Sequence, residues 1–564
     1  MSRYRVREKT PPSVRDALKA HTEVVADLLY ARGICEPEAA AAFLSPHYEA
    51  HAHDPFLLPD MKEVVERVYA AARAGERVAV WSDYDCDGIP GGVMLAQFFS
   101  AIGCVVEHYI PHRHAEGYGL NEEGIAELAK RGVTLIVTVD LGTTDRAPIA
   151  FARTKGIEVI VTDHHLVSGE LPDALVLNPK RPPAQAGGTY PFAHLCGSGV
   201  AWKLLQGLLA RDRSLMPEGQ EKWYLDLVGL ATLSDRVPLV GENRMLAHFG
   251  LHVLRRAKRP GLAALLKLLR IEPRTLTEDD IGFMVAPRIN AASRMDSPQA
   301  AAALLRAEDP EEAALLAREL NRVNDARKGA VASTVKEIHK RLADAPAEGG
   351  MIVMGNPSWR PGILGLVASS VSEREQVPVC LWGREGGEMV RGSCRSPGGV
   401  NVVELMEEAK DLFEDFGGHA LSGGFSLDER RVHELPVRFA AAYEKLRASR
   451  EEPETLLDRE LLIEECGSQT LRNVRRLAPF GEGNPKPLFL FPGARIGRVR
   501  TFGKENNHLE LTLHGGESRI SGIAFFSQPD SFTKAPEQDA KADIVGHLEA
   551  DWSGRPRIRV VDVL

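Results

Sequence analysis

An acidic segment that directly follows an apolar run constrains this chain more than any other feature. Residues 78–80 (Val-Ala-Val) are typical of a buried strand, and Asp83, Asp85 and Asp87 alternate with other residues just beyond it. Side chains two apart on a strand point to the same face, so we expect the three carboxylates to converge where the strand ends. Such an anionic cluster favours a bound divalent cation.

Two other structures explain the same acidic residues. One is a solvated turn closed by Gly88, because turns are commonly built from Asp and Gly. The other is an EF-hand loop, which is disfavoured because the twelfth position of that loop must be Glu and is Met94 in this chain. The choice between a metal site and a turn depends on what lies downstream.

Two later apolar runs also end in acids or imidazoles. Residues 135–139 are followed by Asp140, and residues 159–162 by the triplet Asp-His-His at 163–165. Nearly continuous apolar strands that alternate with helical segments predict a parallel α/β sheet, whose ligand sites form at the carboxyl ends of the strands. We therefore expect these groups at one edge of the sheet, although a lone buried His is more often a hydrogen-bonded core residue.

A fourth contributor is Asp235, which follows a helix-like run at 224–233; alternatively, it is a helix-terminal residue paired with Arg236. Carboxylates and imidazoles without a cysteine thiolate suit Mn²⁺ or Mg²⁺ better than a structural zinc. Two such ions, about 3.5 to 4 Å apart and sharing one Asp, are what a two-metal phosphoester hydrolase needs. The sequence thus predicts metal-assisted hydrolysis.

The composition is that of a globular protein without export or membrane signals. The 564 residues are 44% hydrophobic and 26% charged, and no apolar stretch approaches the ~20 residues that span a bilayer. The first residues lack the apolar core of a secretory signal, and the seven cysteines form no C-x-x-C pair, which indicates reduced thiols. We therefore predict a cytoplasmic protein. We also expect the side chain of Cys86 to pack away from those of Asp85 and Asp87, because successive side chains of a strand point to opposite faces.

The net charge of −9 argues against a protein that coats nucleic acid indiscriminately, because Lys and Arg supply most of the non-specific affinity for phosphates. Any groove for nucleic acid must be locally basic. Arg555, Arg557 and Arg559 are the best candidates, since a period of two places all three on one face of a strand. A solvated strand edge is the alternative.

Changes in composition and pattern divide the chain into five parts. They are a helical lead-in (1–49), a metal-bearing α/β domain (50–308), a connecting helix (309–345), a second α/β domain with glycine-rich loops (346–452) and a C-terminal domain of five short strands (453–564). The connecting helix is expected to separate two lobes, or else to pack wholly within the first domain. The five strands fit either a small barrel or a β-sandwich.

Several further segments accompany the acidic and His motifs. They are 111–113 (PHR), 117–119 (GYG), 195–200 (LCGSGV), 286–291 (APRINA), 417–420 (GGHA) and 479–485 (PFGEGNP). With these segments, the chain resembles the DHH phosphoesterases and, more specifically, the bacterial RecJ single-strand-specific exonucleases. The resemblance extends from about Ala50 to Leu564.

The resemblance implies an α/β fold with a two-lobed DHH phosphoesterase core. A parallel-sheet DHH domain and a DHHA1 domain are joined by the long helix, and a C-terminal OB-fold β-barrel binds single strands. It also implies hydrolysis of single-stranded DNA in the 5′-to-3′ direction to mononucleotides, in DNA repair and recombination. The residues that match substrate-binding positions are Ser393, Arg395 and His419 in the second lobe and Arg113 and Arg288 in the first.

Two divalent ions, Mn²⁺ or Mg²⁺, are expected in the first lobe. Their ligands are Asp83 and Asp85 for one ion, Asp87, His164 and Asp235 for the other, and Asp140 between them. His165 is expected to steady the scissile phosphate as charge develops.

Three residues, Leu141, Ser293 and Arg360, depart from the usual family pattern, and none of them is a proposed ligand.

Two other functions stay open: a DHH phosphoesterase for short oligonucleotides or cyclic dinucleotides, and a non-catalytic DNA-binding scaffold. A single-strand-binding protein and a RecQ-type helicase are partners implied by the resemblance alone, and no membrane partner is expected.

Overall fold

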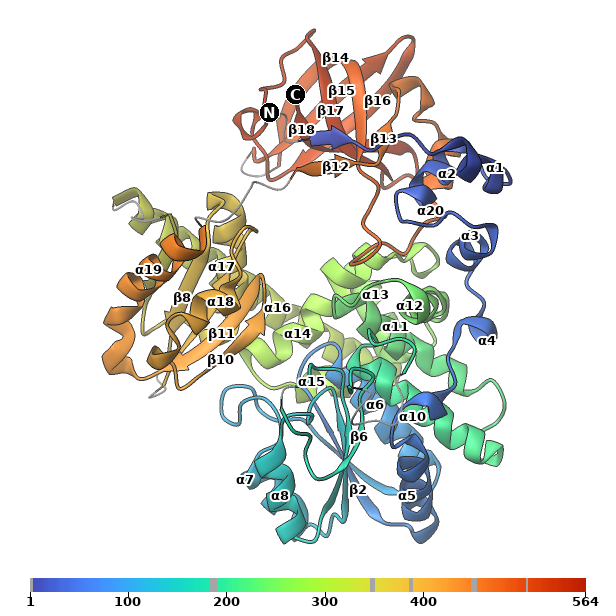
Figure 1. The fold of residues 1–564 in the computed structure, drawn as a ribbon, viewed down its shortest axis with the longest axis vertical. Helices are drawn as coiled ribbons and strands as arrows, with labels where there is room; N and C mark the ends of the chain where they lie inside the picture. Colours follow the sequence, from blue (N-terminus) through green and yellow to red (C-terminus); the bar gives the residue numbers. More distant parts are fainter. Residues whose placement is uncertain are drawn as a thin grey trace.

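The computed structural model describes residues 4–167, 169–182, 190–344, 350–384, 389–447, 454–503 and 506–564. Figure 1 shows an α/β lobe at the bottom, a second lobe at the left and a β-barrel at the top. Within the described part of the chain, no helix combines the length and the apolar character needed to cross a membrane.

The first lobe is built on a five-stranded parallel sheet in the order β3-β2-β4-β5-β6. Its strands are β2 (Arg77–Ser82), β3 (Val105–Tyr109), β4 (Leu135–Val139), β5 (Glu158–Thr162) and β6 (Leu175–Leu177). The strands are apolar on both faces because helices cover both. These are α5 (Met61–Ala74), α6 (Gly88–Ala101) and α10 (Gly197–Arg211) on one side, and α7 (Glu122–Lys130) and α8 (Arg146–Thr154) on the other. The predicted parallel sheet is confirmed, and β2, β4 and β5 end side by side.

Further helices complete the first lobe and connect it to the second. They are α11 (Leu225–Ser234), α12 (Gly241–Leu254), α13 (Pro260–Leu269), α14 (Ala286–Met295), α15 (Gln299–Arg306) and the 35-residue α16 (Pro310–Asp344). Helix α16 packs against α13, α14 and α15 and, farther along, against α17 of the second lobe. The long helix therefore contacts both lobes, and Gly329 does not interrupt it.

The second lobe contains a mixed sheet in the order β10-β11-β9-β8-β7. Its elements are β7 (Ile352–Gly355), α17 (Pro361–Glu375), β8 (Val379–Gly383), β9 (Val390–Arg395), α18 (Val402–Glu407), β10 (Asp415–His419), β11 (Ser422–Leu427) and α19 (Leu435–Arg447). Antiparallel pairing of β9 with β11 brings two of the glycine-rich segments together.

Short 3₁₀ or π segments occur in both lobes and in the C-terminal domain. They lie at Pro55–Leu57, Arg213–Leu215, Glu221–Tyr224, Pro273–Thr275, Asp280–Val285, Lys410–Leu412, Glu429–Glu434, Ile463–Glu465 and Pro529–Ser531.

The C-terminal strands form a closed barrel, as the resemblance implied. They are β13 (Arg459–Glu460), β14 (Phe489–Phe502), β15 (His508–Gly515), β16 (Ser518–Phe525), β17 (Lys541–Ala550) and β18 (Pro556–Val563), and pairing of β14 with β17 closes the sheet. A sandwich is excluded by this closure. Arg557 and Arg559 lie on β18, but Arg555 lies in the preceding turn and pairs with Asp551, so the prediction of three arginines on one strand face is wrong.

The N-terminal segment packs against the barrel. It contains β1 (Tyr4–Val6), α1 (Pro12–Ala17), α2 (Glu23–Tyr30), α3 (Pro37–Leu44) and α4 (Tyr48–His51). Strand β1 pairs in parallel with β12 (Thr455–Leu457), and α2 contacts α20 (Ser468–Arg475). The lead-in is therefore not purely helical, because its first residues complete a two-stranded sheet that local sequence pattern does not reveal.

Candidate metal centre

The acidic segment forms a turn between β2 and α6 and does not extend the strand. Strand β2 ends at Ser82, and Oδ1 of Asp85 accepts hydrogen bonds from the amides of Asp87 (2.8 Å) and Gly88 (3.1 Å). A Cβ on Gly88 would lie 2.6 Å from the carbonyl oxygen of Asp83, so the turn requires glycine. The carboxylates converge as predicted. They converge because of this turn, so the prediction that side chains alternating along a strand bring them together is wrong.

Asp87 is held by the first turn of α10. The amides of Gly197 (2.6 Å) and Ser198 (2.7 Å) donate to its two carboxylate oxygens, and Oγ of Ser198 donates to its carbonyl oxygen (2.5 Å). Burial and the charge of Asp85 nevertheless raise the pKa of Asp87 to about 6. Asp87 is thus a fixed carboxylate whose charged form needs a positive partner. Its neighbour Cys86 is buried in the core, as predicted.

Asp140, His164 and Asp235 meet the acidic turn from three other elements. Asp140 follows β4 with a φ of +66°, His164 follows β5, and Asp235 is the C-cap residue of α11. Nε2 of His164 lies 3.1 Å from Oδ1 of Asp140 and 3.7 Å from Oδ2 of both Asp87 and Asp235. Residues far apart in the sequence therefore form one cluster.

The donor atoms of this cluster fit a pair of divalent ions. They lie within 4.8 Å of one another in three groups: Asp83, Asp85 and Asp140; Asp87, His164 and Asp235; and Asp140, His164 and His165. Among the described residues, Oδ1 of Asp83, Oδ1 of Asp140 and Oδ2 of Asp235 are buried without a hydrogen-bond partner. Unpaired carboxylate oxygens beside an imidazole are a donor set that suits Mn²⁺ or Mg²⁺.

The electrostatics of the cluster agree with this donor set. Burial, reinforced by the neighbouring carboxylates, raises the pKa of Asp83, Asp140 and Asp235 well above the ordinary value. Burial, with the charge of His165, lowers the pKa of His164 to about 3. The imidazole of His164 is therefore neutral, which is the form that binds metal, and the carboxylates lack compensating positive charge.

His165 is oriented by Asp163 and Tyr118. Its Nδ1 lies 2.8 Å from Oδ1 of Asp163, and the hydroxyl of Tyr118 lies 3.3 Å from the same nitrogen and donates to the carbonyl oxygen of Asp140 (3.1 Å). Burial opposes ionisation of both partners. The hydrogen bond nevertheless raises the pKa of His165 and, with other hydrogen bonds, lowers that of Asp163. The two residues form a charged pair at the edge of the cluster.

Several residues for which the sequence predicted no role support this site. Asp163 and Tyr118 orient His165, and the side chain of Asn290 accepts the amide of Cys86 (2.8 Å). Each lies inside a segment already singled out, at 163–165, 117–119 and 286–291. The signal was therefore present, but the role depends on contacts that only the fold provides.

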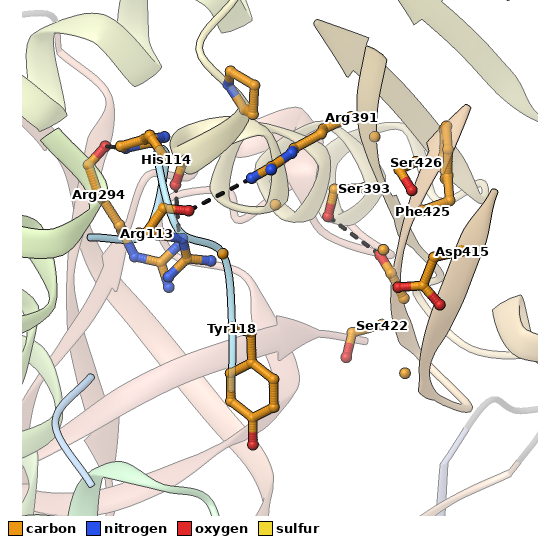
Figure 2. A pocket seen from close by; sticks show the side chains of 18 of the residues that line it. Arg113, His114, Tyr118, Arg294, Arg391, Ser393, Asp415, Ser422, Phe425 and Ser426 are labelled. Carbon is orange, nitrogen blue, oxygen red and sulfur yellow. Dashed lines mark hydrogen bonds between the residues drawn. The ribbon is translucent and has the colours of Figure 1, made fainter. Parts of the chain in front are cut away.

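The second lobe faces the first across a cavity of about 690 Å³, which Tyr84 and Tyr118 line beside the cluster. Figure 2 shows Arg113, Tyr118 and Arg294 of the first lobe on one side and Ser393 of the second lobe on the other. Nη1 of Arg391 donates to the carbonyl oxygen of Arg113 (3.5 Å), and this contact joins the two lobes. The cavity is therefore bounded by cationic and hydroxyl groups from both.

Arg395 connects this cavity with a second one. Its Nη1 donates to Oγ of Ser393 (2.9 Å), and burial lowers its pKa. The second cavity, of about 790 Å³, is lined by Arg395 and His419 together with His164 and Asp235 of the metal cluster. Arg395 and His419 thus share a cavity with the cluster, whereas Ser393 lines only the first cavity. The substrate-binding roles that the resemblance implies for all three stay predictions.

Arg288 does not share this position. It is 5% exposed, and it donates to Oδ1 of Asn321 (3.0 Å) and to the carbonyl oxygen of Met284 (2.6 Å). It lines neither cavity, because α16 covers its guanidinium. Arg294, one turn and a half farther along α14, lines the cavity instead and donates to the carbonyl oxygen of Gly362 (3.1 Å).

Comparison with known proteins matches three families along the chain. Residues 77–232 match the DHH family, N-terminal domain, residues 348–446 the DHHA1 domain and residues 457–561 the RecJ OB domain. A single-stranded-DNA-specific exonuclease RecJ of Bacillus subtilis is 33% identical over 547 residues, which are 96% of this chain and 68% of that protein. The RecJ of Salmonella typhimurium is 34% identical over 86% of this chain and 88% of that protein.

Solved structures agree with these matches. The structure of RecJ from Thermus thermophilus in complex with Mn²⁺ superposes with a TM-score of 0.82 at 30% identity, over 100% of this chain and 79% of that one. An exonuclease RecJ bound to manganese superposes with a TM-score of 0.59 at 33% identity, over 70% of this chain and 96% of that one. From the domain order, the sequence identity and the fold, this chain belongs to the RecJ family.

Proposed function

We propose that this chain is a two-metal exonuclease that hydrolyses single-stranded DNA to mononucleotides in the 5′-to-3′ direction. The observation that carries the proposal is the convergence of carboxylates and imidazoles in a cavity that Arg395 and His419 of the second lobe also line. Two of the relatives compared above are named single-stranded-DNA-specific exonucleases, and both solved relatives contain manganese. These names support the same substrate and the same ions.

The ligand groups divide between two ions. Asp83 and Asp85 would hold one ion, Asp87, His164 and Asp235 the other, and Asp140 both, because Asp140 belongs to groups on either side. When bound, such a pair of ions polarises a phosphate oxygen and makes hydroxide available near neutral pH.

His165 would stabilise the scissile phosphate. Its Nδ1 is bonded to Asp163, which leaves Nε2 to donate to a phosphate oxygen as negative charge develops. One donor of this kind contributes about 2.7 to 4 kcal/mol to the transition state. The same hydrogen bond holds the imidazole in a single orientation.

The cavity between the lobes is suited to a terminal nucleotide. Arg395, fixed against Ser393, offers a guanidinium to a phosphate, and Arg113 lies 4.8 Å from the ring centre of Tyr84. A volume of about 690 Å³ has the size of a small-molecule pocket, which favours one nucleotide over a duplex.

The barrel offers a second surface for the strand. The guanidinium groups of Arg557 and Arg559 lie 5.9 Å and 5.7 Å from the ring centre of Phe525, and neighbouring Phe526 is 82% exposed. His508 packs edge-on against both Phe rings. Aromatic faces beside arginines bind single strands through stacking and phosphate contacts.

Degradation assays test the proposal. Single strands labelled at either end are incubated with Mn²⁺ and wild-type protein or Asp140→Ala, beside duplex and dinucleotide controls. We expect wild type to release labelled mononucleotide from the 5′ end first, and Asp140→Ala to be inactive. Degradation that persists in Asp140→Ala would contradict the proposed metal role of Asp140, whereas cleavage of the dinucleotide alone would favour the small-substrate phosphoesterase.

Three further statements stay predictions. They are the roles in repair and recombination, the single-strand-binding protein and RecQ-type helicase as partners, and the cytoplasmic location.

A further inference from the structure

The loop 479–485 (PFGEGNP), which the mechanism above does not use, connects the barrel to the first lobe. It follows α20 and Leu477, which belong to the core of the barrel. In Figure 1 the chain descends from α20 toward α12 and α13. The amide of Phe480 donates to Oε1 of Glu278 in the first lobe (3.1 Å), so the loop contacts both bodies.

The loop has a fixed shape because its polar groups are paired internally. Asn484 is fully buried and donates from Nδ2 to the carbonyl oxygens of Leu477 (2.9 Å) and Pro479 (2.8 Å). Its Oδ1 accepts from Nε of Arg32 (2.6 Å) in the N-terminal segment. Arg244 of α12, 2% exposed, donates to the carbonyl oxygen of Pro479 (3.4 Å). The loop is thus held from the barrel, the lead-in and the first lobe.

The loop packs against the segment that follows Asp235. The amide of Leu239 donates to the carbonyl oxygen of Glu482 (2.7 Å). Gly483 has a φ of +69°, and a Cβ there would lie 3.0 Å from Cβ of Pro238. The two stretches of backbone therefore lie so close that a side chain at Gly483 forces one of them to move.

Asp235 depends on this segment for its position. The next residue, Arg236, has a φ of +60°, so the chain turns sharply just after the carboxylate. On the other side, Oγ of Ser234 donates to the carbonyl oxygen of Cys86 in the acidic turn (3.0 Å). Within the described residues, Oδ2 of Asp235 has no hydrogen-bond partner. The direction of this carboxylate is therefore set by the backbone around it.

We propose that the loop 479–485 is a positioning element for Asp235, through which the docking of the barrel sets the metal affinity of the catalytic lobe. The inference rests on the proposed two-metal hydrolysis and goes beyond it, because it gives the barrel a role at the metal centre as well as in strand binding. Residues that orient metal ligands from outside change metal affinity by about 10- to 100-fold when they are replaced.

Gly483→Val tests the proposal, with Gly75→Val as the matched control. Gly75 has a φ of +64° and nothing within 4 Å of its Cβ position, so it carries the same backbone cost without the contact to Pro238. We expect the half-saturating Mn²⁺ concentration, measured by hydrolysis and by titration calorimetry, to rise about 10- to 100-fold in Gly483→Val. At saturating Mn²⁺ the rate returns close to that of wild type, and Gly75→Val stays close to wild type throughout.

A milder variant covers the case in which Gly483→Val does not fold. In Gly481→Ala the new Cβ would lie 2.8 Å from Cδ1 of Leu239, the flexible end of a side chain, so we expect a smaller shift in the same direction. Melting temperatures in EDTA show whether each variant is folded without metal.

The possible outcomes separate the two proposals. An unchanged Mn²⁺ half-saturation in the folded Gly483 and Gly481 variants, or an equal shift in Gly75→Val, overturns the positioning role and leaves the proposed function standing. If Mn²⁺ neither binds to nor activates the wild-type protein, the proposed function fails, and the positioning role fails with it.

Discussion

Nδ1 of His165 lies 2.8 Å from Oδ1 of Asp163, a carboxylate that belongs to none of the three groups of potential metal ligands. Asp163 also accepts hydrogen bonds from the amides of His164 (2.7 Å) and Thr143 (3.0 Å). It therefore fixes the imidazole relative to the backbone that carries the ligands. An orienting carboxylate of this kind stands outside the metal cluster and still determines the chemistry in it.

Asp163→Asn is expected to lower kcat about 10- to 100-fold while KM changes little. An amide has one acceptor oxygen where the carboxylate has two, so at least one of the four donors around residue 163, which include the amide of His165 (3.2 Å), loses its partner. Steady-state kinetics on a single-stranded oligonucleotide measure the effect. A kcat equal to that of wild type would contradict the orienting role of Asp163.

Asp140→Asn is expected to lower the rate by roughly 10³-fold, since the ions that we propose it holds would contribute several kcal/mol. The same change should raise the melting temperature of the metal-free protein. Burial raises the pKa of Asp140, so its charged form destabilises the fold at neutral pH, and the destabilisation fades as the pH falls and the group takes up a proton. Melting in EDTA and in Mn²⁺ tests both statements: Mn²⁺ should stabilise wild type more than the variant. A variant that melts below wild type in EDTA would contradict the electrostatic argument.

His108→Gln is expected to reduce the acid sensitivity of the fold. Nε2 of His108 lies 2.9 Å from Oγ of Ser82, and burial, with the charge of Arg306, lowers the pKa of His108 from 6.5 to about 3. Below pH 6.5 the unfolded chain binds a proton that the folded chain does not. The free energy of unfolding therefore decreases as the pH decreases. At about pH 5 the loss is ~2 kcal/mol. Urea unfolding in EDTA at about pH 7.5 and about pH 5 should show a smaller difference for the variant. Equal differences would mean that His108 titrates normally.

Arg559→Ala and Phe525→Ala are expected to weaken the binding of long single strands by different mechanisms. Loss of a stacking ring costs about 1 to 3 kcal/mol per base, whereas loss of a phosphate contact also lowers the slope of log K against log salt by about 1. Binding titrations at several salt concentrations separate the two effects. Hydrolysis of a dinucleotide should be unchanged in both variants, and a loss there would place the barrel face at the catalytic cluster.

The parts of the fold that depend on local pattern were predictable from the sequence. The run 135–139 became β4 with the same limits, because a continuous series of apolar residues is a local property. Convergence of the ligands was also predictable, since parallel strands must end at a common edge.

What could not be predicted depends on contacts between distant segments. The acidic turn owes its shape to Asp85 accepting amides of its own loop and to amides of α10 that hold Asp87. Arg288 and Arg294 share one short helix, and only the position of α16 decides which guanidinium is covered and which faces the cavity. No local pattern distinguishes these two arginines.

Helix α16 spans 35 residues and packs against α13, α14 and α15 of the first lobe and against α17 of the second, so it connects the lobe that contains the cluster with the lobe that contains Arg395. Each residue of an α-helix advances the chain by about 1.5 Å and rotates it by about 100°. A single residue inserted midway would therefore swing the second lobe around the helix axis by more than a quarter of a circle. The position of Arg395 relative to the cluster therefore depends on rotation about this helix, so an insertion keeps the two aligned only if it adds close to a whole number of turns.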